Sequence, residues 1–431
     1  MWFSMFSRRP ALTPGSVLMV LKFVVFIFIL GSVAYHLFPL FYGITDRIHR
    51  RADDTFVLMA VADPQIEGNH KVESHNFIKG KFDLWGNDQF LRHLVSTCKF
   101  WGKPDAVVTL GDLVSFQYLD DKEAADRSRR LQRIFGIDNE SMHSPDHKPP
   151  LLSIAGNHDI GYGRELHPRK LEQWEKFYGP LNWVWHGRTR AGTKFRILGL
   201  NSQALDDVAW DEVMEGTESV DTGDDPLHST TNTLNTAVLS FQPLSDAARE
   251  TWDFVLRAAT TDTDVATILV THIPLYKPDG VCVDAPLVQR DFNGRIVTQN
   301  HLSQTTTRHL LRLFPNLMTV LSGHDHCGCE YKHVNDQGVV IPEHTLPSVM
   351  GYFGGNIGFL RLSSEFVHND QHRVPQTRLD LVTAGPSHLW WALIFGTTMM
   401  LRACVLGKLV EFFVNFRRRF RPETETEKDL H

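Results

Sequence analysis

The chain has 431 residues and a formal net charge of −6 at pH 7. This length allows one large catalytic domain with insertions, and no internal repeat is visible. Because nonspecific binding to nucleic acid needs a basic patch, the acidic balance excludes nucleic acid from the expected partners.

The first predicted element is an apolar segment near the N-terminus. Between residues 15 and 43 the charged or imidazole side chains are Lys22 and His36 alone. The part from 22 to 42 has the ~20 residues that a helix needs to cross a bilayer. It is longer than the apolar core of a signal peptide, about 7–15 residues. We therefore expect an uncleaved transmembrane helix over 22–42, with a cleaved signal peptide as the alternative.

Apolar runs typical of buried strands follow further along the chain. They cover residues 56–62, 106–110, 151–155, 195–200, 265–270 and 317–321, and helical spacing occurs at 87–99, 252–256 and 309–314. Strands that alternate with helices indicate an α/β sheet assembly. The later runs at 338–341, 357–362 and 377–382 have no helices between them and predict a second sheet that closes the domain.

Two segments interrupt this pattern, at residues 118–150 and 206–236. The first is charged and begins with good helix formers, whereas the second is acidic and rich in Thr, Ser, Asp and Gly. We interpret both as surface insertions near the catalytic face. They are either loops without a role or parts of a substrate lid.

The last predicted element is a second membrane span over 389–409. Residues 389–406 are apolar except for Arg402, and Trp390 and Trp391 stand at one end like an aromatic belt. Basic residues follow the other end: Lys408, Arg417, Arg418, Arg419 and Arg421. An interfacial amphipathic helix is the alternative, because the uninterrupted apolar run ends at residue 401.

The basic residues that flank the two spans predict the topology. Arg8 and Arg9 precede the first span and the basic cluster follows the second, although Arg47, Arg50 and Arg51 weaken the first signal. The positive-inside rule then places 1–21 and 410–431 in the cytosol and the domain 52–385 in the lumen or outside the cell. On that side Asn139, in Asn139-Glu140-Ser141, is a candidate glycosylation site.

The cysteines of the domain would also lie in an oxidising compartment. Such a compartment permits disulfides. Cys282 follows the lone His272, and Cys327 and Cys329 follow the last histidine motif. A bridge from Cys282 to Cys327 or to Cys329 would brace these two loops, and free buried thiols are the alternative.

Chemically active side chains stand at the ends of the strand-like runs. The stretches are Asp63-Pro64-Gln65, Gly111-Asp112, Gly156-Asn157-His158-Asp159, Thr271-His272 and Gly323-His324-Asp325-His326. The carboxyl ends of strands in α/β sheets are where ligands gather. Any single histidine here has a structural role as its simpler explanation, but the ordered set is typical of a two-metal phosphoesterase.

A role follows for each of these residues from the needs of a two-metal site. We expect Asp63, Gln65 and His326 at a first metal and Asp112 as the bridging carboxylate. Asn157, His272 and His324 would bind the second metal. His158 directly follows a ligand, which makes it the candidate general acid for the leaving oxygen.

These motifs resemble those of the calcineurin-like metallophosphoesterase superfamily over about residues 55–365. The resemblance implies a four-layer α/β/β/α sandwich that carries two divalent metal ions, here flanked by two transmembrane helices. Gln65 departs from the usual His. An amide oxygen is a harder ligand than an imidazole, so it favours Mn²⁺ or Mg²⁺ over Zn²⁺ and should bind more weakly. Gly111-Asp112-Leu113-Val114-Ser115 lacks the downstream carboxylate of the Ser/Thr phosphatases, which makes protein phosphatase activity the weaker interpretation.

The chain also resembles a narrower group, the membrane-bound enzymes that trim ethanolamine phosphate from GPI-anchor glycans. This resemblance rests on the two spans, on Ala-Asp-Pro-Gln-Ile at 62–66 and on Leu346-Pro347-Ser348. That likeness implies a Mn²⁺-dependent phosphodiesterase in the endoplasmic reticulum or Golgi membrane, with GPI-anchored proteins or the GPI glycan as substrate. The alternatives are a phosphoesterase for another lumenal lipid or glycan, and a weakly active trafficking adaptor.

Three further residues are candidates for substrate binding. His344, Tyr352 and Asn356 follow the last metal motif, the latter two in a glycine-rich segment, 350–358, that can shape a phosphate or sugar pocket. A packed turn without contact to substrate is the competing interpretation.

Overall fold

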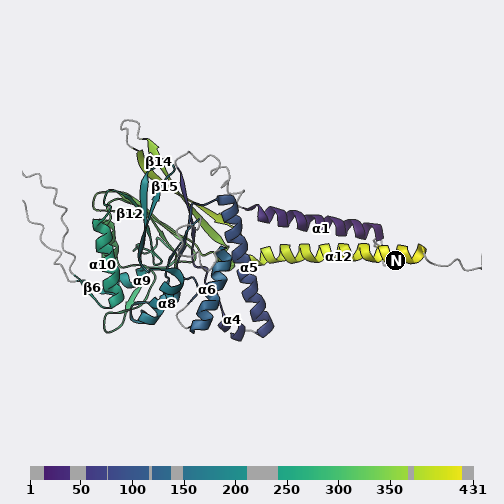
Figure 1. Cartoon of the computed structure of the whole chain (residues 1–431), viewed down its shortest axis with the longest axis horizontal. Coiled ribbons are helices and arrows are strands. Elements are labelled where there is room, and N and C mark those ends of the chain that lie inside the picture. Colours follow the sequence, from purple (N-terminus) through teal and green to yellow (C-terminus); the bar gives the residue numbers. More distant parts are fainter. Residues whose placement is uncertain are drawn as a thin grey trace, which may run out of the picture.

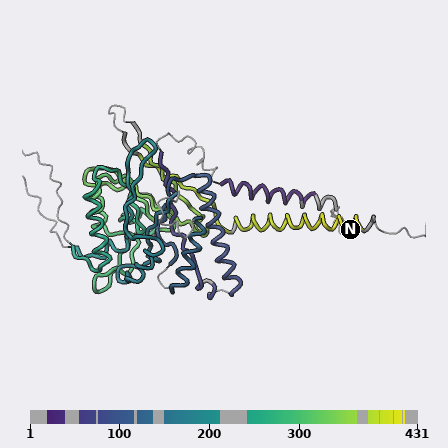
Figure 2. Tube along the Cα trace, viewed as in Figure 1, coloured from purple at the N-terminus to yellow at the C-terminus, as the bar shows by residue number. Residues whose placement is uncertain are grey.

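The structure is a computed structural model that describes residues 14–38, 55–74, 76–115, 119–136, 149–210, 241–366 and 373–419. Asn139 and the basic residues at 8, 9, 47, 50, 51 and 421 lie outside these ranges. A domain of strands and helices occupies one end of the molecule, and two helices, α1 (Pro14–His36) and α12 (Ser387–Arg419), project from it side by side (Figure 1; Figure 2).

The first sheet has five strands in the order β15-β14-β1-β2-β3. Its strands β1 (Phe56–Val61), β2 (Ala106–Leu110) and β3 (Leu151–Ile154) are parallel. The strands β14 (Asn356–Phe366) and β15 (Arg373–Thr383) complete it in antiparallel pairing.

The second sheet has six strands in the order β12-β13-β11-β8-β5-β4. Its parallel strands are β5 (Lys194–Gly199), β8 (Ala266–Val270), β11 (Leu317–Ser322) and β13 (Val340–Thr345). The antiparallel edge strands are β4 (Trp183–Arg188) and β12 (Cys329–Val334). Two short ribbons lie apart, β6 (Val208–Trp210) with β7 (Phe241–Pro243) and β9 (Val288–Arg290) with β10 (Ile296–Gln299).

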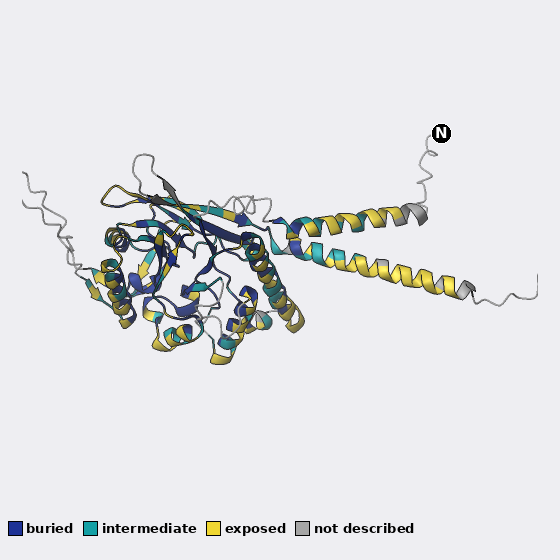
Figure 3. Ribbon diagram, turned by 45° about the horizontal axis from the view of Figure 1, so that its top comes forward, coloured by how far each residue is buried: buried dark blue, intermediate teal, exposed yellow. Residues whose placement is uncertain are grey.

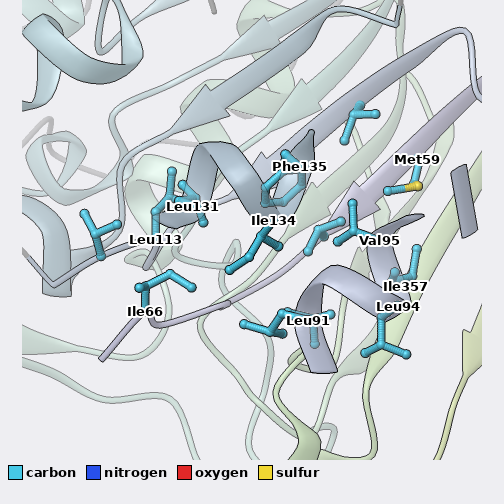
Figure 4. Close-up of a cluster of buried hydrophobic side chains, with 14 of the residues drawn as sticks. Met59, Ile66, Leu91, Leu94, Val95, Leu113, Leu131, Ile134, Phe135 and Ile357 are labelled. Carbon is cyan, nitrogen blue, oxygen red and sulfur yellow. The ribbon is translucent and has the colours of Figure 1, made fainter. Parts of the chain in front are cut away.

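The two sheets pack face to face, and helices cover both outer faces. Side chains of a strand alternate between its faces. On β1, Leu58 faces the core between the sheets and Met59 faces the helices. The outer helices of the first sheet are α5 (Phe77–Gly102), α6 (Asp121–Phe135) and α8 (Pro168–Tyr178), preceded by α4 (Asn69–Ser74), and Figure 4 shows their core. Those of the second are α10 (Asp246–Thr260) and α11 (Gln304–Leu313). The predicted α/β/β/α sandwich is therefore confirmed.

The six central strands fall within one or two residues of their predicted bounds, but three other expectations were wrong. The predicted second sheet at the C-terminal end does not form, because β14 and β15 pair with β1 while β13 joins β11. Helix α5 begins at Phe77, ten residues before the predicted start at 87. The start of the segment 118–150 is not a surface insertion, since α6 buries Leu131 and Phe135 in the core. Residues 211–240, most of the other proposed insertion, lie outside the described ranges.

The projecting helices are α1 (Pro14–His36) and α12 (Ser387–Arg419). Among the described residues one helical stretch, Leu389–Phe413, is long and apolar enough to cross a membrane, and the apolar stretch Lys22–His36 of α1 is shorter. Small residues let the two helices approach closely, because a side chain at Gly396 would collide with Phe28, and Ser32 Oγ lies 3.1 Å from Thr397 Oγ1. The first span remains a prediction, and its helix begins before residue 22 and ends at 36 rather than 42.

Candidate metal centre

The predicted metal ligands meet where the parallel strands of the two sheets end. Asp63 follows β1, Asp112 follows β2, Asn157 follows β3, His272 follows β8, and His324 and His326 follow β11. These loops face one another because the two sheets are stacked. Local sequence therefore places each ligand at a strand end, and the packing of the sheets brings the ligands together.

The backbone of this centre is unusual at four of the predicted ligands. Asp63, Gln65, Asp112 and His324 have φ values of 50°, 40°, 52° and 71°. Non-glycine residues rarely occupy this region, and such strain clusters at functional sites. Gly156 is required beside them, since a Cβ there would collide with the Asp112 carboxylate.

The first half of the centre, which we call the inner subsite, consists of Asp112, Asn157, His272 and His324. The Nδ1 of His272 lies 2.7 Å from the Leu110 carbonyl, and the Nε2 of His324 lies 3.0 Å from the Gln299 carbonyl. A neutral imidazole donates from one nitrogen only. Each ring therefore keeps its other nitrogen unprotonated, and these two atoms, His272 Nε2 and His324 Nδ1, face each other at 3.2 Å.

The charge state of the inner subsite fits a cation. Burial lowers the pKa of His272, and it brings the pKa of His324 to about 3, so both rings are neutral at pH 7. His272 Nε2 also lies 3.0 Å from Asn157 Oδ1 and 3.4 Å from Asp112 Oδ1. Four electron-rich atoms thus converge without a proton between them. A divalent metal that accepts nitrogen and oxygen ligands fits this donor set.

The second half of the centre, which we call the outer subsite, consists of Asp63, Gln65, Asp112 and His326. The ligand atoms of Asp63, Asp112 and His326 lie within 4.8 Å of one another, as do those of Asp112, His272 and His324. Burial, reinforced by the Asp112 charge, raises the pKa of the Asp63 carboxyl well above its ordinary value. Two buried carboxylates this close are both ionised only when positive charge lies between them, as a divalent cation would supply. Asp112 belongs to both halves, as a bridging ligand must.

Gln65 lies in the outer subsite with its amide turned toward the other ligands. Its Nε2 is 3.2 Å from Asp112 Oδ2 and 3.2 Å from His326 Nε2. Turning the amide over would present its oxygen to the same atoms, since the two orientations fill the same space. His326 is 27% exposed and packs edge-on against Phe353. The outer subsite is thus more open to solvent than the inner one.

His158 lies at the open side of the centre. Its backbone N–H donates to Asp112 Oδ1 at 2.9 Å, and its ring Nε2 is 3.8 Å from Asp112 Oδ2. The side chain is 49% exposed. It therefore stands beside both subsites without belonging to either cluster of ligands, as expected of a proton donor rather than a ligand.

One organising residue was missed in the sequence. The Asp159 carboxylate is fully buried and accepts hydrogen bonds from the backbone N–H groups of Leu113, Val114, Ser115 and Gly156. It ties the loop of Asp112 to the loop of Asn157. Its position in the sequence could have revealed this role. Asp159 ends the Gly-Asn-His-Asp motif, and a carboxylate there can reach the backbone N–H groups at the end of the neighbouring strand.

The three candidate substrate residues lie in different surroundings. Tyr352 is 90% exposed and lines a cavity that borders Gln65. The Asn356 amide donates to the carbonyls of Ser348 and Phe353. These hydrogen bonds match the competing interpretation, a packed turn. His344 lies on β13 against Glu330 of β12. Of the three, the structure thus brings Tyr352 beside the centre.

The predicted loop brace exists between Cys282 and Cys329. Among the described residues Cys98 is a buried free thiol and Cys327 an exposed one. The disulfide joins the segment after His272 to the strand after His326. It therefore braces the loops that carry histidines of both subsites.

A family model described as calcineurin-like phosphoesterase matches residues 56–328, which contain all the ligands above. The chain belongs to the calcineurin-like phosphoesterase family. This phosphoesterase is a hydrolase, and the family and its two ligand clusters support a site for two divalent metal ions.

Several curated proteins are similar to this phosphoesterase. An uncharacterized protein of Schizosaccharomyces pombe is 40% identical over 90% of this chain and 95% of its own length. Protein TED1 of Saccharomyces cerevisiae is 24% identical over 79% of this chain and 80% of its own. Metallophosphoesterase 1 of Danio rerio is 27% identical over 57% of each chain.

Proposed function

We propose that this phosphoesterase is a Mn²⁺-dependent phosphodiesterase that removes ethanolamine phosphate from the glycan of GPI anchors in the early secretory pathway. One observation carries the substrate class. A cavity of about 430 Å³ begins at Pro64 and Gln65 of the metal centre and extends to Pro386 and Ser387, where α12 starts. If α12 crosses the bilayer, this cavity leads from the membrane surface to the metals. A membrane-tethered substrate suits such a path.

The walls of the cavity fit the chemistry of this substrate. Its charged lining residues are Glu67, Asp88 and Arg130, and Arg130 binds Asp88 through two nitrogens at 2.6 and 2.7 Å. Glu67, the other carboxylate of the lining, accepts from the Asn87 amide at 3.1 Å. A carboxylate here attracts an ammonium group such as that of ethanolamine. The exposed Tyr352 ring on the same wall offers a sugar its apolar face.

Within this proposal each residue of the centre has a role. Asp63, Gln65 and His326 would hold the outer metal, Asn157, His272 and His324 would hold the inner metal, and Asp112 would bind both. The two cations would supply Lewis acidity and lower the pKa of water at the site. His158 donates a proton to the leaving oxygen from the open side. The amide oxygen of Gln65 favours Mn²⁺ over Zn²⁺.

The proposed setting is the membrane of the endoplasmic reticulum or Golgi. Helices α12 and α1 would span it as a pair, with the domain 52–385 and its glycosylation site Asn139 on the lumenal side. Small residues and hydroxyl groups at the crossing of the two helices support this pairing, since membrane helices associate through such contacts. The partners are then the lipid bilayer and GPI-anchored proteins.

The test uses the purified full chain loaded with Mn²⁺ and three synthetic mannosides. One carries ethanolamine phosphate, the second carries ethyl phosphate without the amine, and the third is the phosphomonoester. We expect metal-dependent cleavage of both diesters, with the ethanolamine compound faster, and loss of that preference in Glu67→Gln. A preference for the monoester would contradict the diesterase, and equal cleavage of the two diesters would point to another lipid or glycan substrate. A metal-loaded, folded protein that cleaves none would favour the adaptor.

A further inference from the structure

Helix α5 lies across the base of the two projecting helices (Figure 1; Figure 2). In its C-terminal half, His93 stacks on Trp390 of α12 and on Tyr35 of α1, with ring centroids 5.4 and 5.6 Å apart. Gly86 lets the two elements approach, since a Cβ there would meet the Trp391 ring at 3.3 Å. The helix is thus held at the level where α12 leaves the domain.

The N-terminal half of α5 carries an exposed apolar stripe. Ile78 is 81% exposed, Phe82 49% and Trp85 48%, and Phe77 beside them is 63% exposed. Residues at i, i+4 and i+7 share one face of a helix. The stripe, defined as Phe77, Ile78, Phe82 and Trp85, is therefore one patch on the side away from the core. Patches of this kind on a folded domain mark contact surfaces.

The stripe is continuous with the start of α12. Phe82 lies 5.9 Å from Phe395, and Trp85 lies 5.1 Å from Trp391, measured between ring centroids. Leu389–Phe413 of α12 is the stretch that is apolar enough to cross a membrane, and it is exposed along most of its length (Figure 3). Whatever surrounds the beginning of α12 therefore also covers the stripe.

Positive charge borders the stripe on the other side. A hollow of about 320 Å³ between α5 and α6 is lined by Trp85, by Arg92 and Arg133, and by Arg130, which is paired with Asp88 of the same lining. Arg92 and Arg133 are exposed. Tryptophan beside arginine is the composition of a membrane interface, where the ring sits among head groups and the cation binds their phosphates.

We propose that the N-terminal half of α5 lies in the plane of the membrane interface, with the stripe inserted among the lipids that surround α12. Lipid fits better than a protein partner because the stripe is continuous with the candidate span and is bordered by arginines. The inference rests on α12 as a membrane helix and is independent of the substrate. It has a consequence for access, because Leu84 and Asn87, on the inner side of the same helix turns, line the cavity that reaches the metals. Lipids and cavity are then separated by one helix.

The experiment is spin labelling of the full chain in phosphatidylcholine–phosphatidylserine vesicles. A single cysteine replaces Ile78 in a background with Cys327→Ser and Cys404→Ser, while buried Cys98 and the disulfide stay. The control label replaces Asp253, an exposed residue of α10, the helix at the end of the domain away from α12 (Figure 1). A third label, at Met399 of α12, reports whether that helix is in the bilayer. Power saturation with oxygen and with a water-soluble nickel chelate gives the depth of each label.

The proposal expects the label at 78 to be relaxed by oxygen much more than by nickel, and the label at 253 to show the reverse. Strong nickel relaxation at 78 with a lipid signature at 399 would overturn the inference and leave the span intact. Weak relaxation by both reagents at 78 would mean a protein partner or a second copy, which also overturns it. An aqueous signal at 399 would remove the proposed span, on which the inference depends.

A functional measurement separates this role from the chemistry. The double variant Ile78→Asp and Phe82→Asp should keep the turnover of a soluble diester unchanged, because neither residue lines the cavity or the centre. On a substrate anchored in vesicles it should lose about tenfold in kcat/KM, since the domain no longer sits at the surface that concentrates the substrate. Equal turnover of the anchored substrate by the variant and the parent would contradict a role in access.

Discussion

The inner and outer subsites share Asp112 but are built differently. In the inner subsite His272 is fully buried, and both histidines are oriented by backbone carbonyls, of Leu110 and Gln299. In the outer subsite His326 is partly exposed and Gln65 replaces an imidazole with an amide. Partners that fix ring orientation raise the affinity of a metal ligand. The difference teaches that one half of the centre is preorganised for a metal, whereas the other is more open to solvent, so we expect the outer subsite to bind its metal more weakly.

The largest effect is expected from Asp112→Asn, which removes the shared ligand. Both subsites should lose affinity, and kcat should fall by more than roughly a thousandfold, the upper range for a single electrostatic element of an active site. Metal content by mass spectrometry and turnover check this. Asp325→Asn is the matched control, because Asp325 lies between His324 and His326 but belongs to neither ligand cluster. If Asp112→Asn bound two metals and turned over normally, the shared-ligand assignment would be wrong.

The next effect is expected from His158→Ala, which removes a side chain that lies near Asp112 but belongs to neither ligand cluster. The variant should bind both metals and lose about 10²–10⁴-fold in kcat, the usual contribution of a general acid. A substrate whose leaving group needs no proton should restore most of the rate. Loss of metal in this variant would instead make His158 a ligand, and an unchanged rate would exclude it as the acid.

A third change weakens the support of the loops that carry the histidines. Glu343 is buried and accepts from the Leu275 N–H and the Ser322 hydroxyl, so it braces the loops after β8 and β11. Burial alone would raise its pKa, but Lys277 at 3.1 Å and His333 at 2.7 Å outweigh burial and lower the pKa to about 2. Glu343→Gln leaves the Lys277 ammonium buried without its countercharge, and such a loss costs about 3 kcal/mol of unfolding free energy.

The role of Glu343 can also be tested by the pH dependence of stability. Because the folded pKa is depressed, the contribution of Glu343 is complete above its unfolded pKa, near 4.5, and is lost as pH falls toward 2. Thermal unfolding of the metal-free protein should therefore show a smaller loss of stability between pH 5 and 3 in Glu343→Gln than in the parent. The surface variant Asp262→Asn, which breaks the exposed pair with His186, should change the midpoint little. Equal midpoints for Glu343→Gln and the parent at pH 7 would contradict the brace.

The sequence predicted which side chains gather in the two subsites better than it predicted what holds those side chains in place. Motifs at strand ends identify Asp63, Asp112 and His272, because strand ends in α/β sheets are where ligands gather. The carbonyl of Gln299 that orients His324 is a backbone group, and no residue type reveals it. The pairing of β14 with β1 depends on contacts between distant segments that local periodicity does not encode. The first turns of α5 were not predicted, because glycines at 80 and 86 and apolar residues on the outer face disturb the pattern of an amphipathic helix.

The smallest effect is expected from Gln65→His, which strengthens the outer subsite alone. An imidazole would replace the weaker amide, so the affinity of the outer metal should rise about tenfold, within the range of single changes around a metal. Stepwise chelation should then remove the two metals of the variant together, whereas the parent should pass through a species with one metal. The softer ligand should also move the metal preference from Mn²⁺ toward Zn²⁺. If the parent loses both metals at once, the two subsites have equal affinity and their difference in exposure does not control metal binding. If the variant still loses one metal early, the weakness of the outer subsite comes from the exposed His326 rather than from Gln65.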